Sequence, residues 1–132
     1  MASIFTKIIN RELPGHFIYE DDKCVVILDK FPQVEGQSLV IPKAEVDYAF
    51  DLDEETYEHI FKVAQKVALA SDKALGAKRT CLVVEGFEVP HVHIRLYPMQ
   101  STEESLGNYM SGGEEASDDS LASIAEKIKS AL

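Results

Sequence analysis

The sequence predicts an α+β fold: an antiparallel sheet of about five strands with one main helix and a C-terminal helix. Three observations lead to this prediction. Two short β-type runs are joined by only three residues, one long segment has apolar residues at helical spacing, and a later run alternates polar and apolar residues. A connection of three residues is too short for a parallel crossover, so the sheet should contain antiparallel pairs.

The first third of the chain is predicted to be rich in strands. Residues 16–20 and 24–28 form the two runs, and Asp21-Asp22-Lys23 joins them as a hairpin. A third strand is expected over residues 37–41. It should end at Pro42, because proline cannot donate a hydrogen bond to a neighbouring strand.

The main helix is expected to follow. Asp51 and Glu54 have the spacing of a capping box, which would start the helix, and Gly76 would end it. Apolar residues recur between them every three or four positions and form one face, which we expect to pack on the core. This face comprises Tyr57, Ile60, Phe61, Ala64, Val67 and Ala68. His59 lies off this face and is given no functional role.

Two strands and a final helix complete the predicted elements. The strands cover residues 80–85 and 91–97 and are joined by a short loop. An amphipathic helix is predicted at residues 121–132, with acidic residues before its start and lysines near its end. We therefore divide the chain into one domain, residues 1–99, an acidic loop, residues 100–120, and this helix.

Composition and charge exclude several classes of function. Thirteen basic and twenty-three acidic side chains give a net charge of −10, whereas nucleic acids and anionic membranes attract a positive field. We therefore expect no nucleic-acid partner and no membrane partner. No stretch approaches the ~20 apolar residues of a membrane span. Cys24 and Cys81 lie in apolar runs and are interpreted as buried thiols of a reducing compartment. No signal peptide is evident at the start of the sequence. A cytoplasmic protein is therefore predicted.

The residues most informative about function lie in the last predicted strand. Alternate side chains of a strand share a face, so His91, His93 and Arg95 should point one way. Three interpretations compete: an exposed polar face without function, a metal site and a phosphate site. A metal site needs a third ligand, and a cation beside Arg95 is unfavourable. In a phosphate site, imidazole supplies a nucleophile, the guanidinium matches phosphate oxygens, and Gly86 lets backbone N–H groups approach them.

Three blocks of the sequence occur in an order typical of a known family. They are residues 4–14, residues 19–43 and the run His91-Val92-His93-Ile94-Arg95-Leu96-Tyr97. Together they resemble the histidine triad (HIT) family of nucleotide-binding hydrolases and transferases, whose motif is His-φ-His-φ-His-φ-φ with φ apolar. The resemblance covers residues 4–98 and implies the HIT fold. Members of the family are commonly homodimers, so a homodimer is expected.

The resemblance implies a role for each matching residue. His93 matches the nucleophile that attacks the α-phosphorus of a nucleotide, and His91 matches the first histidine, which helps to orient the site. Arg95 stands where the third histidine lies against the phosphate and leaving group. Asp29 matches the acid that binds the ribose hydroxyls. The apolar slot for the base is matched by Ile4, Phe5, Ile8 and Leu13.

Several differences from the family pattern qualify this picture. The guanidinium of Arg95 stays protonated at neutral pH and cannot protonate a leaving group, although it can stabilise phosphate charge. Glu88 lies where a neutral polar residue often contacts phosphate, and it would repel the ligand unless it points away. Gln37 replaces a histidine found in many bacterial members. Ser3 and Thr6 replace two cysteines that bind zinc in some members, so no metal and no cofactor is expected.

We therefore predict a hydrolase or nucleotidyl transferase that acts on the α-phosphate of a nucleotide conjugate, with purines favoured by the resemblance alone. Its expected partner is a small-molecule nucleotide. The alternative is a binding module of the same family without catalysis, for which Arg95 and Glu88 are the reasons. A metal-dependent protein is a third possibility. The acidic loop directly follows the predicted catalytic strand and is expected to form part of a substrate gate.

Overall fold

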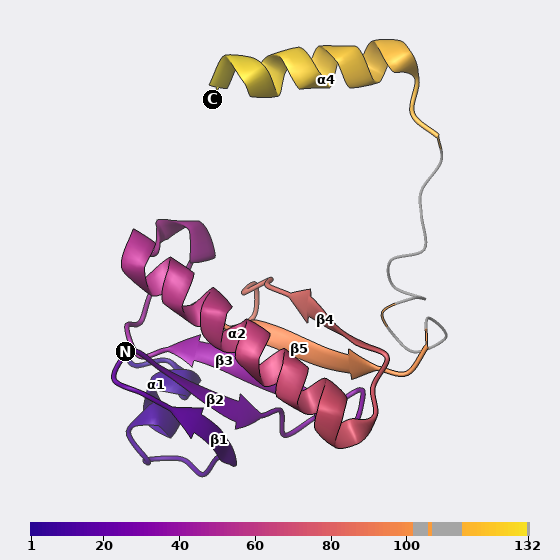
Figure 1. The fold of residues 1–132 in the computed structure, drawn as a ribbon. Coiled ribbons are helices and arrows are strands. Elements are labelled where there is room, and N and C mark those ends of the chain that lie inside the picture. The colour runs from indigo at the N-terminus through magenta and orange to yellow at the C-terminus, as the bar shows by residue number, and fades with distance from the viewer. Residues whose placement is uncertain (102–105, 107–114, 132) are drawn as a thin grey trace.

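The computed structural model describes residues 1–101, 106 and 115–131. Its centre is an antiparallel sheet with the strand order β1-β2-β3-β5-β4 (Figure 1). The strands are β1 (Phe17–Glu20), β2 (Cys24–Leu28), β3 (Ser38–Pro42), β4 (Arg79–Val83) and β5 (Ile94–Met99). The helices are α1 (Ile4–Ile9), the 3₁₀ helix η1 (Ala49–Asp51), α2 (Glu54–Leu75) and α4 (Asp118–Ala131). The predicted α+β class and five-stranded antiparallel sheet are confirmed.

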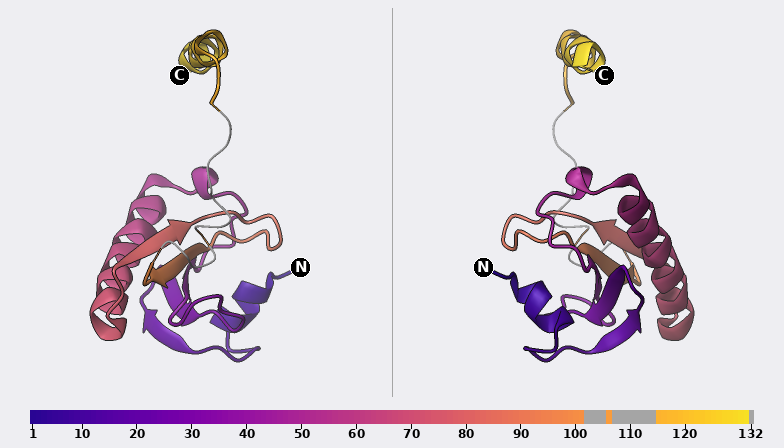
Figure 2. Two further views of the ribbon diagram at one scale, coloured as in Figure 1. Left: turned by 90° about the vertical axis from the view of Figure 1, so that its right-hand side faces the viewer. Right: turned by 90° about the vertical axis from the view of Figure 1, so that its left-hand side faces the viewer.

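The sheet separates two apolar clusters. Helix α2 covers one face of the sheet and α1 lies against the other, as the side views show (Figure 2). Neighbouring residues of a strand point to opposite faces, so Val26 and Val40 pack under α2, whereas Val25 and Ile41 pack on the side of α1. On α2 the buried residues are Ile60, Val63, Ala64 and Val67. One side of the sheet is therefore the main core, and the other side carries α1.

The start of β5 differs from the prediction. The strand begins at Ile94 rather than at His91. The reason lies in the backbone: the His91 N–H donates to the Val89 carbonyl and the Val92 N–H donates to the Val46 carbonyl, instead of to a neighbouring strand. His91 therefore belongs to the turn that leads into the strand.

The predicted start of the main helix is also wrong. Asp51 ends the 3₁₀ helix η1, and the residue that caps α2 is Asp53. Its carboxylate accepts the Thr56 N–H at 2.7 Å, which satisfies one of the free amides of the first turn. The other end is as expected, because Gly76 adopts φ +65° and closes the helix in the left-handed conformation that glycine adopts without strain.

The C-terminal helix is present as α4 and starts at Asp118 rather than at Leu121. Within the predicted acidic loop, residues 102–105 and 107–114 lie outside the described residues. The division into domain, loop and helix, and the role of the loop as a gate, therefore stay predictions. In the part of the chain that the structure describes, no helix is long and apolar enough to cross a membrane.

The turn between β1 and β2 is held by the carboxylate of Asp21. Its Oδ1 accepts the backbone N–H groups of Lys23 and Cys24 at 2.8 and 2.9 Å. Its Oδ2 accepts the Tyr19 hydroxyl at 2.7 Å and His59 Nε2 at 2.6 Å, which ties the hairpin to α2. Burial alone would raise the pKa of Asp21, but these hydrogen bonds outweigh it and hold the pKa well below its usual range. His59 thus has a structural role that its position off the apolar face did not suggest.

Replacing Asp21 with Asn should lower the free energy of unfolding at pH 7 by about 2 kcal/mol, because an amide NH₂ group then faces donors that the carboxylate accepted. The pKa of Asp21 is lower in the folded than in the unfolded state. Its contribution is therefore present above about pH 4 and declines as the pH falls further. Urea denaturation of D21N and of the wild type between pH 3 and 7 measures it. The exposed neighbour variant D22N is the control, and equal stability of all three proteins at pH 7 would contradict the prediction.

Candidate active site

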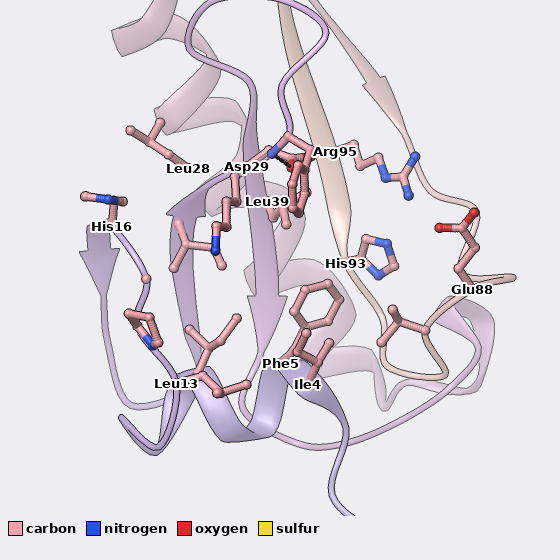
Figure 3. A pocket seen from close by; sticks show the side chains of 17 residues that line it. Ile4, Phe5, Leu13, His16, Leu28, Asp29, Leu39, Glu88, His93 and Arg95 are labelled. Atoms are coloured by element: carbon pink, nitrogen blue, oxygen red, sulfur yellow. Dashed lines mark hydrogen bonds between the residues drawn. The ribbon is translucent and has the colours of Figure 1, made fainter.

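A cavity of about 700 Å³ lies between α1 and the sheet, within the size range of small-ligand pockets (Figure 3). His93, Arg95 and Glu88 lie together on one side of it, and Leu13 and Leu28 lie on the opposite side. Most of the predicted site residues line this cavity, namely Ile4, Phe5, Ile8, Leu13, Asp29, His93 and Arg95. The structure thus brings residues from the two ends of the predicted domain into one site.

Helix α1 forms the apolar wall of the cavity, and it is not among the helices predicted from the sequence. Ser3 caps it, because its hydroxyl accepts the Thr6 N–H at 3.0 Å. Ile4 and Ile8 are one helical turn apart and line the cavity together. The Phe5 ring lies 4.8 Å from the His93 ring, centroid to centroid. Ser3, a residue type that favours the N-cap, directly before the apolar pair Ile4 and Phe5 was the available signal for this short helix.

His93 directly precedes β5, is 3% exposed and lines the cavity. Its Nδ1 donates to the His91 carbonyl oxygen at 2.8 Å. A carbonyl oxygen only accepts, so in the neutral ring the proton is on Nδ1 and the lone pair is on Nε2. Burial lowers the pKa of His93, and the nearby charge of Arg95 lowers it further, against the opposing effect of the hydrogen bond to His91. The site therefore contains a neutral imidazole with a free lone pair.

His91 does not line the cavity. It is fully buried behind His93, with Nε2 donating to the Pro42 carbonyl oxygen at 2.8 Å and Nδ1 lying 2.6 Å from the Ser3 hydroxyl. Its own ring also meets the Phe5 ring edge-on at 5.9 Å. Its contact with the site is thus indirect, through its carbonyl oxygen and through Phe5.

Arg95 and Glu88 place opposite charges at the polar side of the cavity. Burial would lower the pKa of Arg95, but its hydrogen bond to Tyr97 and the negative charges of Glu85 and Asp29 raise it, so the guanidinium stays charged. Glu88 faces the same cavity rather than pointing away from it. An anionic ligand here would meet one attractive and one repulsive group.

Asp29 is held in place by its neighbours. Its Oδ1 accepts the Phe31 N–H at 2.9 Å, and its Oδ2 accepts Gln37 Nε2 at 2.7 Å. Gln37 is itself buried, and its amide oxygen accepts the Gln33 N–H at 2.8 Å. Each carboxylate oxygen keeps a second lone pair for a ligand donor. From the sequence alone, Gln37 is only a difference from the family pattern. In the structure its amide group orients Asp29.

Gly86 lies apart from the main cavity. It lines a smaller cavity of about 80 Å³ that also borders His93, together with Asp47 and Phe50. Its φ of +85° is in the left-handed region, where a side chain would be strained. The expected approach of its backbone N–H groups to a phosphate stays a prediction.

Comparison with known proteins identifies the family. The HIT domain pattern matches residues 10–102, which is more than half of the chain. The chain belongs to the HIT family. An uncharacterised HIT-like protein from Borreliella burgdorferi is 35% identical over 108 residues, which cover 72% of this chain and 73% of that protein.

Solved HIT structures share the fold. A histidine triad nucleotide-binding protein from Candida albicans is 27% identical, with a TM-score of 0.82 over 99% of this chain and 97% of that one. A HIT family protein from Bacillus anthracis is 28% identical, with a TM-score of 0.78 over 98% of this chain and 96% of that one. Both likenesses extend over the elements that build the cavity.

One group of possible metal ligands is present among the described residues of this HIT protein. It consists of Asp21, Cys24 and His59, whose ligand atoms lie within 4.8 Å of one another. The group is outside the cavity, and the oxygens of Asp21 already accept four hydrogen bonds. Burial, together with the negative charge of Asp21, raises the pKa of Cys24 to about 12, so the thiol stays protonated. These bonds account for the group as a structural one.

An NMR titration of the histidine rings should find His93 with a pKa below the ordinary value of about 6.5, because burial disfavours the charged ring. At pH 7 the long-range ¹H–¹⁵N spectrum should show the proton on Nδ1. The spectrum of H93A identifies the signal. A His93 ring that titrates above the ordinary value, or that carries its proton on Nε2, would refute this description of the site.

Proposed function

We propose that this HIT protein is a hydrolase or nucleotidyl transferase that acts on the α-phosphate of a purine nucleotide conjugate. The observation that carries the proposal is the neutral, buried His93 at the polar side of a cavity with apolar walls. Such a ring is a nucleophile at neutral pH without a separate base. The Candida albicans relative is described as nucleotide-binding, which supports a nucleotide as the ligand.

The cavity offers a place for each part of a nucleotide. We assign the base to the apolar side, between α1 and Leu13, and the ribose hydroxyls to the oxygens of Asp29. The α-phosphate then lies between His93 and Arg95, where the guanidinium fork fits two phosphate oxygens. Purines are named on the family resemblance and not on a contact in the cavity.

The reaction follows from these placements in two steps. His93 Nε2 attacks the α-phosphorus, so that a P–N bond forms while the bond to the leaving group breaks and the leaving group takes its electron pair. Arg95 stabilises the charge on the phosphoryl oxygens. Water then attacks the same phosphorus, the P–N bond returns its electrons to Nε2, and the mononucleotide leaves as a proton passes to solvent. With another acceptor in place of water, the same steps give transfer.

A nucleotide-binding module without catalysis is the second candidate. Glu88 lines the cavity beside His93, and its carboxylate would repel the phosphate. Arg95 also cannot release a proton to a leaving group, because the guanidinium is too weak an acid. A site with this composition could hold a nucleotide through its base and ribose and leave the phosphate unreacted.

The assembly and compartment are part of the same proposal. We propose a homodimer, in keeping with the family resemblance; β1 and β4 form the two edges of the sheet, and Leu82 on β4 is exposed. A reducing compartment such as the cytoplasm suits Cys24 and Cys81, both of which are free thiols.

The first test is release of AMP from an adenylate mixed anhydride. The wild type should release AMP, and H93A should be slower by about 10³-fold or more, because the P–N intermediate cannot form. Thermal melting of H93A confirms that it is folded. If a nucleotide raises the melting temperature of the wild type and no AMP appears, the binding module replaces the enzyme.

The second test uses the leaving group. Arg95 cannot protonate a departing amine, so the wild type should cleave a mixed anhydride with a higher kcat/KM than a phosphoramidate of the same nucleotide. In R95H an imidazole can supply that proton, and the ratio should shift toward the phosphoramidate by about tenfold or more. Faster cleavage of the phosphoramidate than of the mixed anhydride by the wild type would contradict this role of Arg95.

A further inference from the structure

Four side chains that lie outside the cavity meet behind His93. Ser3 and Thr6 come from the start of α1, Glu45 from the segment after β3, and His91 from the turn before β5. Family resemblance gives the first three no role in the chemistry. Their hydrogen bonds nevertheless form a continuous path from the N-terminal segment to the nucleophile.

The hydrogen bonds of the His91 ring determine whether the Ser3 hydroxyl donates or accepts in their contact. The Pro42 carbonyl oxygen only accepts, so His91 Nε2 carries a proton, and in the neutral ring Nδ1 is an acceptor. The Ser3 hydroxyl lies 2.6 Å from Nδ1 and is placed to donate its proton there. The same oxygen accepts the Thr6 N–H at 3.0 Å, so one hydroxyl both caps α1 and satisfies a fully buried imidazole nitrogen.

Glu45 holds Ser3 from the other side. Its Oε1 accepts the Ser3 backbone N–H and the Thr6 hydroxyl, each at 2.6 Å. These two hydrogen bonds lower the pKa of Glu45 below its ordinary value, so the carboxylate is charged at neutral pH. Charge-assisted hydrogen bonds are stronger than neutral ones. The backbone and the hydroxyl of Ser3 are therefore both restrained.

Two contacts connect the restrained residues Ser3 and His91 to His93, the proposed nucleophile. The carbonyl oxygen of His91 accepts the Nδ1 proton of His93 at 2.8 Å. Phe5, on the helix that Ser3 caps, lies 5.9 Å from the His91 ring and 4.8 Å from the His93 ring. A shift of His91 or of α1 would therefore change both the hydrogen bond and the ring contact that orient His93.

We propose that Ser3, anchored by Glu45, is a positioning residue that fixes the nucleophile His93 through His91. Ser3 does not line the cavity, and its effect is on the geometry of attack rather than on the ligand. Misplacement of a reacting group by about 1 Å can cost on the order of 10² in rate. The proposal rests on the proposed function for its kinetic consequence, while the state of the His93 ring can be measured without turnover.

The decisive comparison is between S3A and S3T. S3A removes the hydroxyl, whereas S3T keeps it. S3A should lower kcat for AMP release by about 10- to 100-fold, and S3T should stay within a few-fold of the wild type. The control is D53A, which removes the N-cap of α2 but has no link to His93. It should lower the melting temperature, as S3A does, and leave kcat unchanged.

The titration of His93 provides a readout that loss of a helix cap alone does not move. In S3A the loosened ring becomes more accessible to water, so its pKa should rise toward about 6.5, both by NMR and in the acid limb of kcat/KM against pH. S3T and D53A should match the wild type. The proposal is overturned if S3A keeps the wild-type kcat, or if its His93 titration is unchanged. If the wild type releases no AMP, the proposed function fails, and the NMR titration alone still decides the role of Ser3.

Discussion

The hydrogen bond from His93 Nδ1 to the His91 carbonyl determines what this site can do. It places the ring proton on the inner nitrogen and leaves the outer one with its lone pair. Burial keeps the ring neutral, so tautomer and protonation are both fixed before any ligand arrives. Without that bond the ring could flip or change tautomer. The nitrogen facing the cavity would then carry the proton in part of the molecules and the lone pair in the others.

The sheet gives this bond a rigid background. Alternation along β5 sends Ile94 and Leu96 into the core under α2, whereas Arg95 lines the cavity on the other side. The side of the sheet that provides most of the packing is thus separate from the side that holds the candidate active site. The packing of Ile94 and Leu96 in the core fixes the backbone of β5, and this in turn fixes the position of Arg95 between them.

Much of this arrangement could be predicted from sequence, because strands and long helices repeat with simple periods. The hairpin at Asp21-Asp22-Lys23 and the apolar face of α2 follow from such periods. Helix α1 was missed because six residues are too few for periodicity to distinguish a helix from a loop. Two side-chain contacts were also missed. The bond of Gln37 to Asp29 spans the connection between β2 and β3, and the bond of Ser3 to His91 joins segments 88 residues apart, and only the folded chain brings either pair together.

The position of Ser3 has a practical consequence for handling the protein. Its backbone N–H donates to Glu45 only two residues after Met1, which is fully exposed. A purification tag placed directly ahead of Met1 would thus begin next to the hydrogen bonds that link Ser3, His91 and His93. A tag at the C-terminus follows α4 in the chain instead, and comparison of the two fusions should precede any assignment of weak activity to the protein itself.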